Sequence, residues 1–179
     1  NAQTREVISV SDAAEVEHAT QFAGYDHANL SDFATSISAI VEGPDADFVI
    51  MPQTPFYAEK GGQVGDTGFI EINGTAREVF DTKMDNAGHV LHKVRKGVFK
   101  KDSIGAEISA TVDIVRRRAI ERHHSATHIL HWAMRQVLGT HVRQAGSYVD
   151  PERLRFDFTH YEAPTPDQLR EIENLANKK

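Results

Sequence analysis

The sequence contains no cysteine. Disulfide bonds are therefore excluded within these 179 residues, and a cytoplasmic setting is favoured because disulfides belong mainly to oxidising compartments. The sequence also lacks an apolar run of about 18 residues, which a membrane-spanning helix would need, and its first residues show no signal-peptide pattern. We therefore expect a soluble protein that has no membrane partner.

The sequence also has no excess of positive charge, because its 20 Lys and Arg residues are outnumbered by 26 Asp and Glu residues. The net charge is -6 and the isoelectric point is about 5.9, which argues against a protein that binds nucleic acid over its whole surface. We expect no DNA partner, and any RNA contact must be confined to a patch. The glycine spacings of Rossmann and P-loop nucleotide sites are absent. The chain begins Asn1-Ala2 without a methionine, and we interpret this start as a cloning scar or a cut from a longer polypeptide.

Hydrophobic periodicity predicts two kinds of structure along the chain. Over residues 35–112 apolar residues alternate with polar ones, as in Ile108, Ala110 and Val112, and Asn73-Gly74 is typical of a tight hairpin. Five or six short strands with frequent turn signals predict a small antiparallel β-barrel, closed or nearly closed. Residues 1–34 are interpreted as a lead-in segment, with a short helix near residues 12–15 and with Phe22 and Tyr25 packed onto the barrel.

Near Asp113 the period changes to 3.6. A helix is predicted from there to about Leu138, with Gly139 as its end. Alternation returns over residues 142–158 and predicts a hairpin, and Thr165-Pro166 is typical of a second helix start. The predicted fold class is therefore α+β, with a lead-in (1–34), a β-barrel (35–112) and a helix, hairpin and helix unit (113–179).

The first predicted helix gives histidines a face of their own. His124 and His128 are one turn apart, so both imidazoles could bind one tetrahedral cation, although the spacing alone favours a solvated or hydrogen-bonded pair. Thr127 and His131 fall on the same face, and we expect His131 to pack rather than to bind metal.

Two further features admit a functional and a structural interpretation. Gly61 and Gly62 begin a glycine-dense loop, residues 61–68, that could approach a ligand closely or simply turn. Four arginines near the start of the helix oppose its dipole, so we expect either a bound anion such as phosphate or ion pairs with Asp113 and Glu121. These arginines are Arg116, Arg117, Arg118 and Arg122.

Three separated stretches resemble the editing domain of alanyl-tRNA synthetases. The first is QTPFYAEKGGQVGDTG at residues 53–68, and the last is LRFDF at residues 154–158. Between them lies HSATH at residues 124–128, followed by RQVLGTH at residues 135–141 and by Gln144. The resemblance covers the chain from about Phe22 to the last helix and implies a fold of the threonyl/alanyl-tRNA synthetase editing type.

The resemblance implies hydrolysis of the ester that joins wrongly attached serine or glycine to tRNA(Ala). An ATP-dependent ligase needs such a second site because its synthetic pocket cannot exclude a smaller residue or strongly reject an added hydroxyl. In this family zinc is held by two histidines, matched here by His124 and His128, and by the cysteine and histidine of a later CxxxH. That second half is missing here, so we expect the isolated fragment to be inactive and not to hold zinc tightly.

The resemblance also implies roles for substrate-binding residues. Thr127 and Gln144 would contact the aminoacyl group, Gly61 and Gly62 would lie beside the pocket, and the four arginines are candidates for contact with the tRNA acceptor end. No catalytic residue is assigned. Two alternatives stay open: a freestanding trans-editing deacylase, and a non-catalytic RNA- or protein-binding barrel. The lead-in segment favours the full enzyme.

Overall fold

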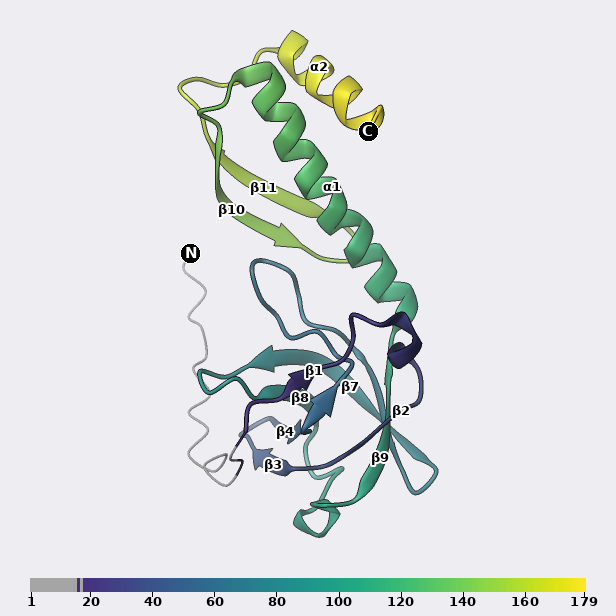
Figure 1. Cartoon of the computed structure of the whole chain (residues 1–179). Helices are drawn as coiled ribbons and strands as arrows, with labels where there is room; N and C mark the ends of the chain where they lie inside the picture. Colours follow the sequence, from purple (N-terminus) through teal and green to yellow (C-terminus); the bar gives the residue numbers. More distant parts are fainter. Residues whose placement is uncertain (1–15, 17) are drawn as a thin grey trace. The chain divides into compact units, whose positions relative to one another are not determined.

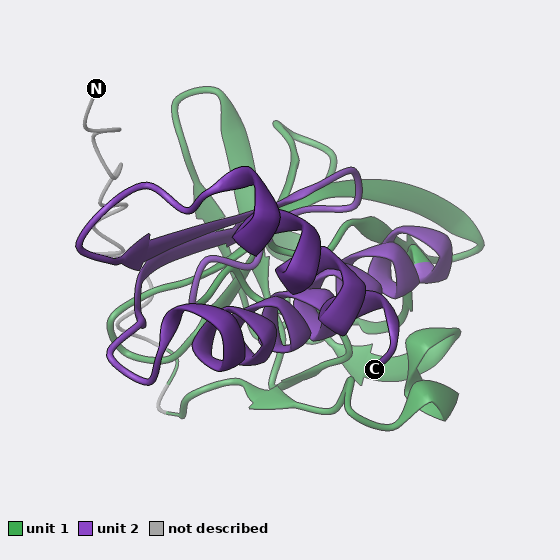
Figure 2. Ribbon diagram, turned by 90° about the horizontal axis from the view of Figure 1, so that it is seen from above, with its two compact units in different colours: residues 1–60, 65–113 green, residues 61–64, 114–179 purple. Residues whose placement is uncertain are grey.

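The computed structural model describes residue 16 and residues 18–179, so the helix predicted near residues 12–15 lies outside the described residues. The chain forms two compact units, coloured separately in Figure 2. Unit 1 comprises the residues up to Lys60 together with Gly65–Asp113. Unit 2 comprises Ile114–Lys179 and a short glycine segment, Gly61–Val64.

Unit 1 is built on a curled, seven-stranded antiparallel sheet whose strand order is β2-β9-β6-β7-β8-β4-β3 (Figure 1). The predicted antiparallel architecture is confirmed, with no α-helix between the strands. The prediction of a closed or nearly closed barrel of five or six strands is wrong, because the seven strands form a half-barrel whose edges, β2 and β3, do not pair with each other. The strands are β2 (Phe33–Ser36), β3 (Ala39–Glu42), β4 (Ala46–Ile50), β6 (Gly68–Ile72), β7 (Thr75–Met84), β8 (Val90–Arg95) and β9 (Glu107–Val112).

The edge strands β2 and β3 come from a stretch that the alternation presents as one strand. The break falls at Ile37 and Ser38, where the backbone changes partners. The Ile37 N–H donates to the Ala106 carbonyl at 3.1 Å, whereas the Ser38 N–H donates to the Ile50 carbonyl at 2.8 Å. Because Ile37 is fully buried, its side chain continues the alternation across the break and hides it from the sequence.

Short elements complete unit 1. β1 (Gln21–Phe22) pairs in parallel with β5 (Gln53–Thr54), and two 3-10 turns, η2 (His27–Leu30) and η3 (Lys101–Ser103), lie in the connections. The Phe22 ring packs edge-on against Tyr57 at 5.9 Å between ring centroids, as expected for the lead-in. The same expectation is wrong for Tyr25, whose ring touches Phe22 but which is 86% exposed.

Unit 2 has the predicted helix, hairpin and helix. α1 (Ile114–Leu138) ends at Gly139, which has a left-handed φ of +114°. β10 (Arg143–Val149) and β11 (Leu154–Thr159) form an antiparallel hairpin with a bulge between Gln144 and Gly146. α2 (Pro166–Asn177) begins with a capping box between Thr165 and Gln168. The core between these elements is formed by Ala133, Met134, Leu138, Val142 and Ile172.

No helix in the described part of the chain combines the length and the apolar character that crossing a membrane requires.

His92 lies fully buried in unit 1 and makes a hydrogen bond with each ring nitrogen. Nδ1 is 2.8 Å from the Val49 carbonyl oxygen, which can only accept, so Nδ1 carries the hydrogen. Nε2 accepts from the Thr54 hydroxyl at 2.7 Å. Burial lowers the pKa of His92 from 6.5 to about 4, although the bond to Val49 opposes this shift. The ring is therefore neutral in the folded protein.

We predict that His92 makes the free energy of unfolding decrease as the pH falls from 6.5 to 4. The unfolded chain binds the extra proton in this window, whereas the folded chain does not, so the contribution is complete above pH 6.5 and is lost toward pH 4. The slope from this group is at most about 1.4 kcal/mol per pH unit. Urea unfolding of the wild type and of His92→Gln over this range measures the difference, and a folded-state ring protonated at pH 6 by NMR would contradict it.

Candidate functional site

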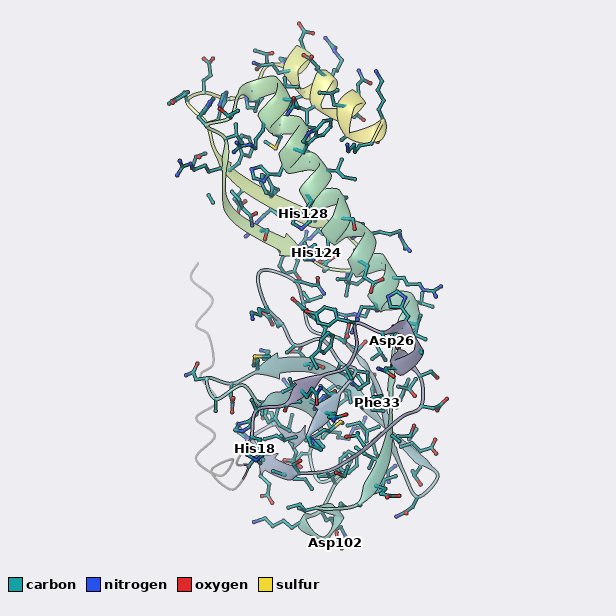
Figure 3. The ribbon with its side chains drawn as sticks, viewed as in Figure 1. His18, Asp26, Phe33, Asp102, His124 and His128 are labelled. Atoms are coloured by element: carbon teal, nitrogen blue, oxygen red, sulfur yellow. The ribbon has the colours of Figure 1, made fainter. Side chains whose placement is uncertain are left out.

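The histidine face of α1 carries the candidate site. His124 and His128 are both exposed, and their ring centroids lie 5.1 Å apart with the ring planes tilted by 38°. Figure 3 shows both side chains on the part of α1 that runs beside the β10–β11 hairpin. The helix thus places the two imidazoles side by side, as their spacing predicts.

The His124 ring has a partner from a distant part of the chain. Its Nδ1 lies 2.6 Å from the Gln63 side-chain oxygen Oε1. An amide oxygen can only accept a hydrogen bond, so Nδ1 is the protonated nitrogen and Nε2 of the neutral ring keeps its lone pair. His124 therefore has one nitrogen committed to the protein and one available as a ligand atom.

The glycine segment reaches this position because it is bound to β10. The Val149 N–H donates to the Gly62 carbonyl at 2.8 Å, and the Val64 N–H donates to the Val149 carbonyl at 3.0 Å. These two bonds form a parallel β-bridge between Gln63 and Val149. Gln63 is buried, with 7% of its surface exposed. The backbone hydrogen bonds fix the position of the segment, and the fixed segment places the Gln63 side chain against His124.

A polar chain connects the bulged strand to the same segment. Gln144 Nε2 donates to the Ser147 Oγ at 3.1 Å, and the Ser147 hydroxyl donates to the Gly61 carbonyl at 3.3 Å. The backbone of Gly62 lies so close to Ser147 that a Cβ on Gly62 would be 2.3 Å from the Ser147 carbonyl oxygen. The structure thus brings together three of the residues predicted for substrate binding: Gly61, Gly62 and Gln144.

Thr127 is buried, and its hydroxyl donates to the His123 carbonyl one turn earlier, at 2.8 Å. The donor is therefore used within the helix, and the oxygen lone pairs are what Thr127 can still offer a ligand. His131 lies against the Phe156 ring at 5.1 Å, and its Nε2 is 3.5 Å from the Val142 carbonyl oxygen. These contacts are those of a packing residue.

His123 connects the helix to the turn between β10 and β11. Its Nδ1 donates to the Asp150 carbonyl at 2.8 Å. Burial raises the pKa of the Asp150 carboxyl, but hydrogen bonds from the backbone N–H groups of Arg153 and Glu152 outweigh burial and hold the pKa below its ordinary value. An ionised Asp150 thus stabilises the hairpin turn that holds His123.

The arginines at the start of α1 differ in their surroundings. Arg117 is buried and lies 3.9 Å from the Glu121 carboxylate, which agrees with the ion-pair interpretation for this residue. Arg116 is partly buried. Arg118 and Arg122 are exposed, so their guanidinium groups are accessible to an anion in solution.

The two histidines fit a zinc ion as half of a tetrahedral ligand set. They supply imidazole nitrogens at one-turn spacing, and the Gln63 bond leaves the His124 Nε2 free to coordinate. The other two positions find no protein donor here, because the described residues contain no group of three or more His, Cys, Asp or Glu side chains placed to hold a metal.

A hollow of about 640 Å³ lies elsewhere, in unit 1, where β2, β6 and β9 line it together with Pro52 and Gln53. None of the residues predicted for the site lines this hollow. We therefore define the candidate site by its hydrogen bonds and its histidine spacing.

Comparison with known proteins identifies the family to which this chain belongs. Residues 1–116 match the model of the family described as tRNA synthetases class II (A). The chain belongs to this family. An alanine–tRNA ligase from Opitutus terrae is 44% identical over 185 residues, covering 99% of this chain and 19% of the relative. One from Acetivibrio thermocellus is 50% identical over 137 residues, covering 75% of this chain and 15% of the relative.

A third alanine–tRNA ligase, from Chloroflexus aurantiacus, is 45% identical over 168 residues, covering 89% of this chain and 18% of the relative. The resemblance to alanyl-tRNA synthetases that the three stretches predict is confirmed by these relatives. The chain spans less than a fifth of the length of each of these three.

Three residues of the site were not predicted from the sequence: Gln63, His123 and Ser147. Gln63 stands between glycines in a loop that the sequence presents as a turn, and its partner is 61 residues away. Ser147 faces Gly61 across 86 residues. Only Gln63 had a usable signal in the sequence, because the two glycines before it are typical of a place where the backbone comes close to another segment.

Gly61 and Gly62 provide a matched pair of substitutions. Both have a left-handed φ, +62° and +87°, but a Cβ on Gly61 meets nothing within 4 Å whereas one on Gly62 collides with Ser147. We expect Gly61→Ala to cost about 1 kcal/mol of unfolding free energy from backbone strain alone. Gly62→Ala should cost about 2 kcal/mol or more and should also shift the His124 ring signals. Urea unfolding with NMR tests this, and equal effects of the two variants would refute the close approach.

Proposed function

We propose that this chain contributes the editing region of an alanine–tRNA ligase, which hydrolyses mischarged seryl- or glycyl-tRNA(Ala). Family membership and the three alanine–tRNA ligases support this proposal. It includes the division into a lead-in (1–34), a β-barrel (35–112) and a partial editing domain of the threonyl/alanyl type (113–179). It also places the parent enzyme in the cytoplasm, with tRNA as its partner.

The observation that carries the proposal is the convergence of the three stretches within unit 2. Gln63 from the first stretch contacts His124 from the second, and Gly61 accepts from Ser147, the partner of Gln144. LRFDF, the third stretch, lies in β11, paired with β10. A barrel with an incidental histidine pair would not require these contacts between separate stretches.

In this proposal each residue has a limited task. Gln144 and the Thr127 oxygen would contact the amino acid of the mischarged ester, and the backbone of Gly61 and Gly62 would border it. Zinc held by His124 and His128, with further ligands from the intact enzyme, would orient the ester or polarise water. Arg118 and Arg122, with Arg116 and Arg117, are candidates for the acceptor end of tRNA(Ala), since arginine binds phosphate well.

We predict that this chain by itself does not retain zinc. Two imidazoles leave two tetrahedral positions to water, and a site of this kind binds weakly. Metal analysis after dialysis against a mild chelator should therefore find much less than one equivalent. One equivalent of zinc that survives this dialysis would refute the prediction.

A second prediction concerns the longer synthetase that carries this chain. Replacing both His124 and His128 by alanine should abolish deacylation of seryl-tRNA, because the ester loses its anchor, while alanine activation at a separate site stays nearly unchanged. Deacylation of purified seryl-tRNA and alanine-dependent pyrophosphate exchange measure the two activities.

The control for this experiment is Gln136→Ala, an exposed change on the same helix, which should affect neither activity. Thermal melting verifies that each variant is folded. Undiminished seryl-tRNA hydrolysis by a folded double variant would show that the proposed site lies on the wrong residues.

A further inference from the structure

His124 and His128 share a helix face but differ in how they are held. His124 has a hydrogen bond of 2.6 Å from Nδ1 to the buried Gln63 side chain, which comes from the glycine segment. A neutral imidazole without a partner exchanges between two tautomers, and only one of them offers a lone pair at Nε2. The partner at Nδ1 therefore decides which nitrogen of His124 can bind a ligand.

The Gln63 side chain is well placed to make this selection. Its backbone neighbours are anchored independently by the two hydrogen bonds between Val149 and the segment, so the side chain is not needed to keep the segment in place. Because Gln63 is buried, water competes little for its oxygen. A short, shielded bond to a fixed acceptor restricts both the tautomer and the orientation of the ring.

We propose that Gln63 is a positioning residue for His124: it holds the Nδ1–H tautomer and thereby presents Nε2, next to His128, as a ligand atom for a divalent metal ion. This inference deepens the proposed function and rests on it for its biological purpose. The bond itself can be tested without any enzymatic activity. Gln63 contacts neither substrate nor metal in this scheme, and it acts through the imidazole.

The first experiment reads the tautomer directly in this chain. Long-range ¹H–¹⁵N NMR spectra at a pH where the histidines are neutral should show His124 as Nδ1–H in the wild type. Gln63→Met has a similar length but no acceptor oxygen, so His124 should then populate both tautomers. Gln63→Glu keeps an acceptor and should preserve Nδ1–H, and Gln136→Met, on the same helix, is the matched control and should leave the ring unchanged.

The second experiment uses Zn²⁺ alone, titrated into the same four proteins and followed by the ring signals of His124 and His128. Loss of a partner that orients a metal-binding histidine typically weakens affinity about 10- to 100-fold. Gln63→Met should show a loss of this size, whereas Gln63→Glu and Gln136→Met should bind Zn²⁺ at least as well as the wild type. The ring signals separate binding at this pair from binding at other histidines.

Three results would overturn the inference: an Nε2–H tautomer for His124 in the wild type, no response of the His124 and His128 signals to Zn²⁺, or equal Zn²⁺ affinity in Gln63→Met and the wild type. Unfolding of Gln63→Met is detected by its melting temperature, and Gln63→Leu then serves as the second variant. The proposed function fails differently, through deacylation that persists in the His124→Ala, His128→Ala synthetase, and that result leaves the tautomer measurement intact.

Discussion

The hydrogen bond between His124 and Gln63 spans 61 positions of the chain, and it exists because the glycine segment lies against β10. Three features of the candidate site depend on that placement. It supplies the partner of one histidine, the acceptor for the Ser147 hydroxyl and the close approach at Gly62. Without the segment, α1 would carry a pair of exposed imidazoles with no defined tautomer.

Two histidines of this protein differ in burial and in what their rings can do: His92 is buried and His124 is exposed. His92 uses both ring nitrogens in hydrogen bonds inside unit 1, so nothing remains for a ligand and its low pKa keeps it neutral. His124 uses one nitrogen and exposes the rest of the ring. The number of nitrogens that the fold satisfies, and not the residue type, separates a structural histidine from one that can bind a metal.

Local signals made much of the fold predictable. The change of period near Asp113, the glycine after Leu138 and the Thr165-Pro166 start each act over a few residues, and α1 and α2 follow them. The break at Ile37 was not predictable, because it arises from an exchange of strand partners while the apolar alternation continues. The histidine pair could likewise be found from its spacing, because both residues lie on one helix. Gln63 and Ser147 could not, because their partners are far away in the sequence.

The assignment of Gly61–Val64 to unit 2 also bears on modularity. The polypeptide passes between the units at 60/61, 64/65 and 113/114, so unit 2 is not one continuous stretch of the gene. A recombination event or an engineered transfer that begins at Ile114 would move both histidines and leave the Gln63 side chain behind. A transferred segment that keeps His124, His128 and Gln63 together must therefore begin before Gly61. Such a segment also includes the strands of residues 65–113.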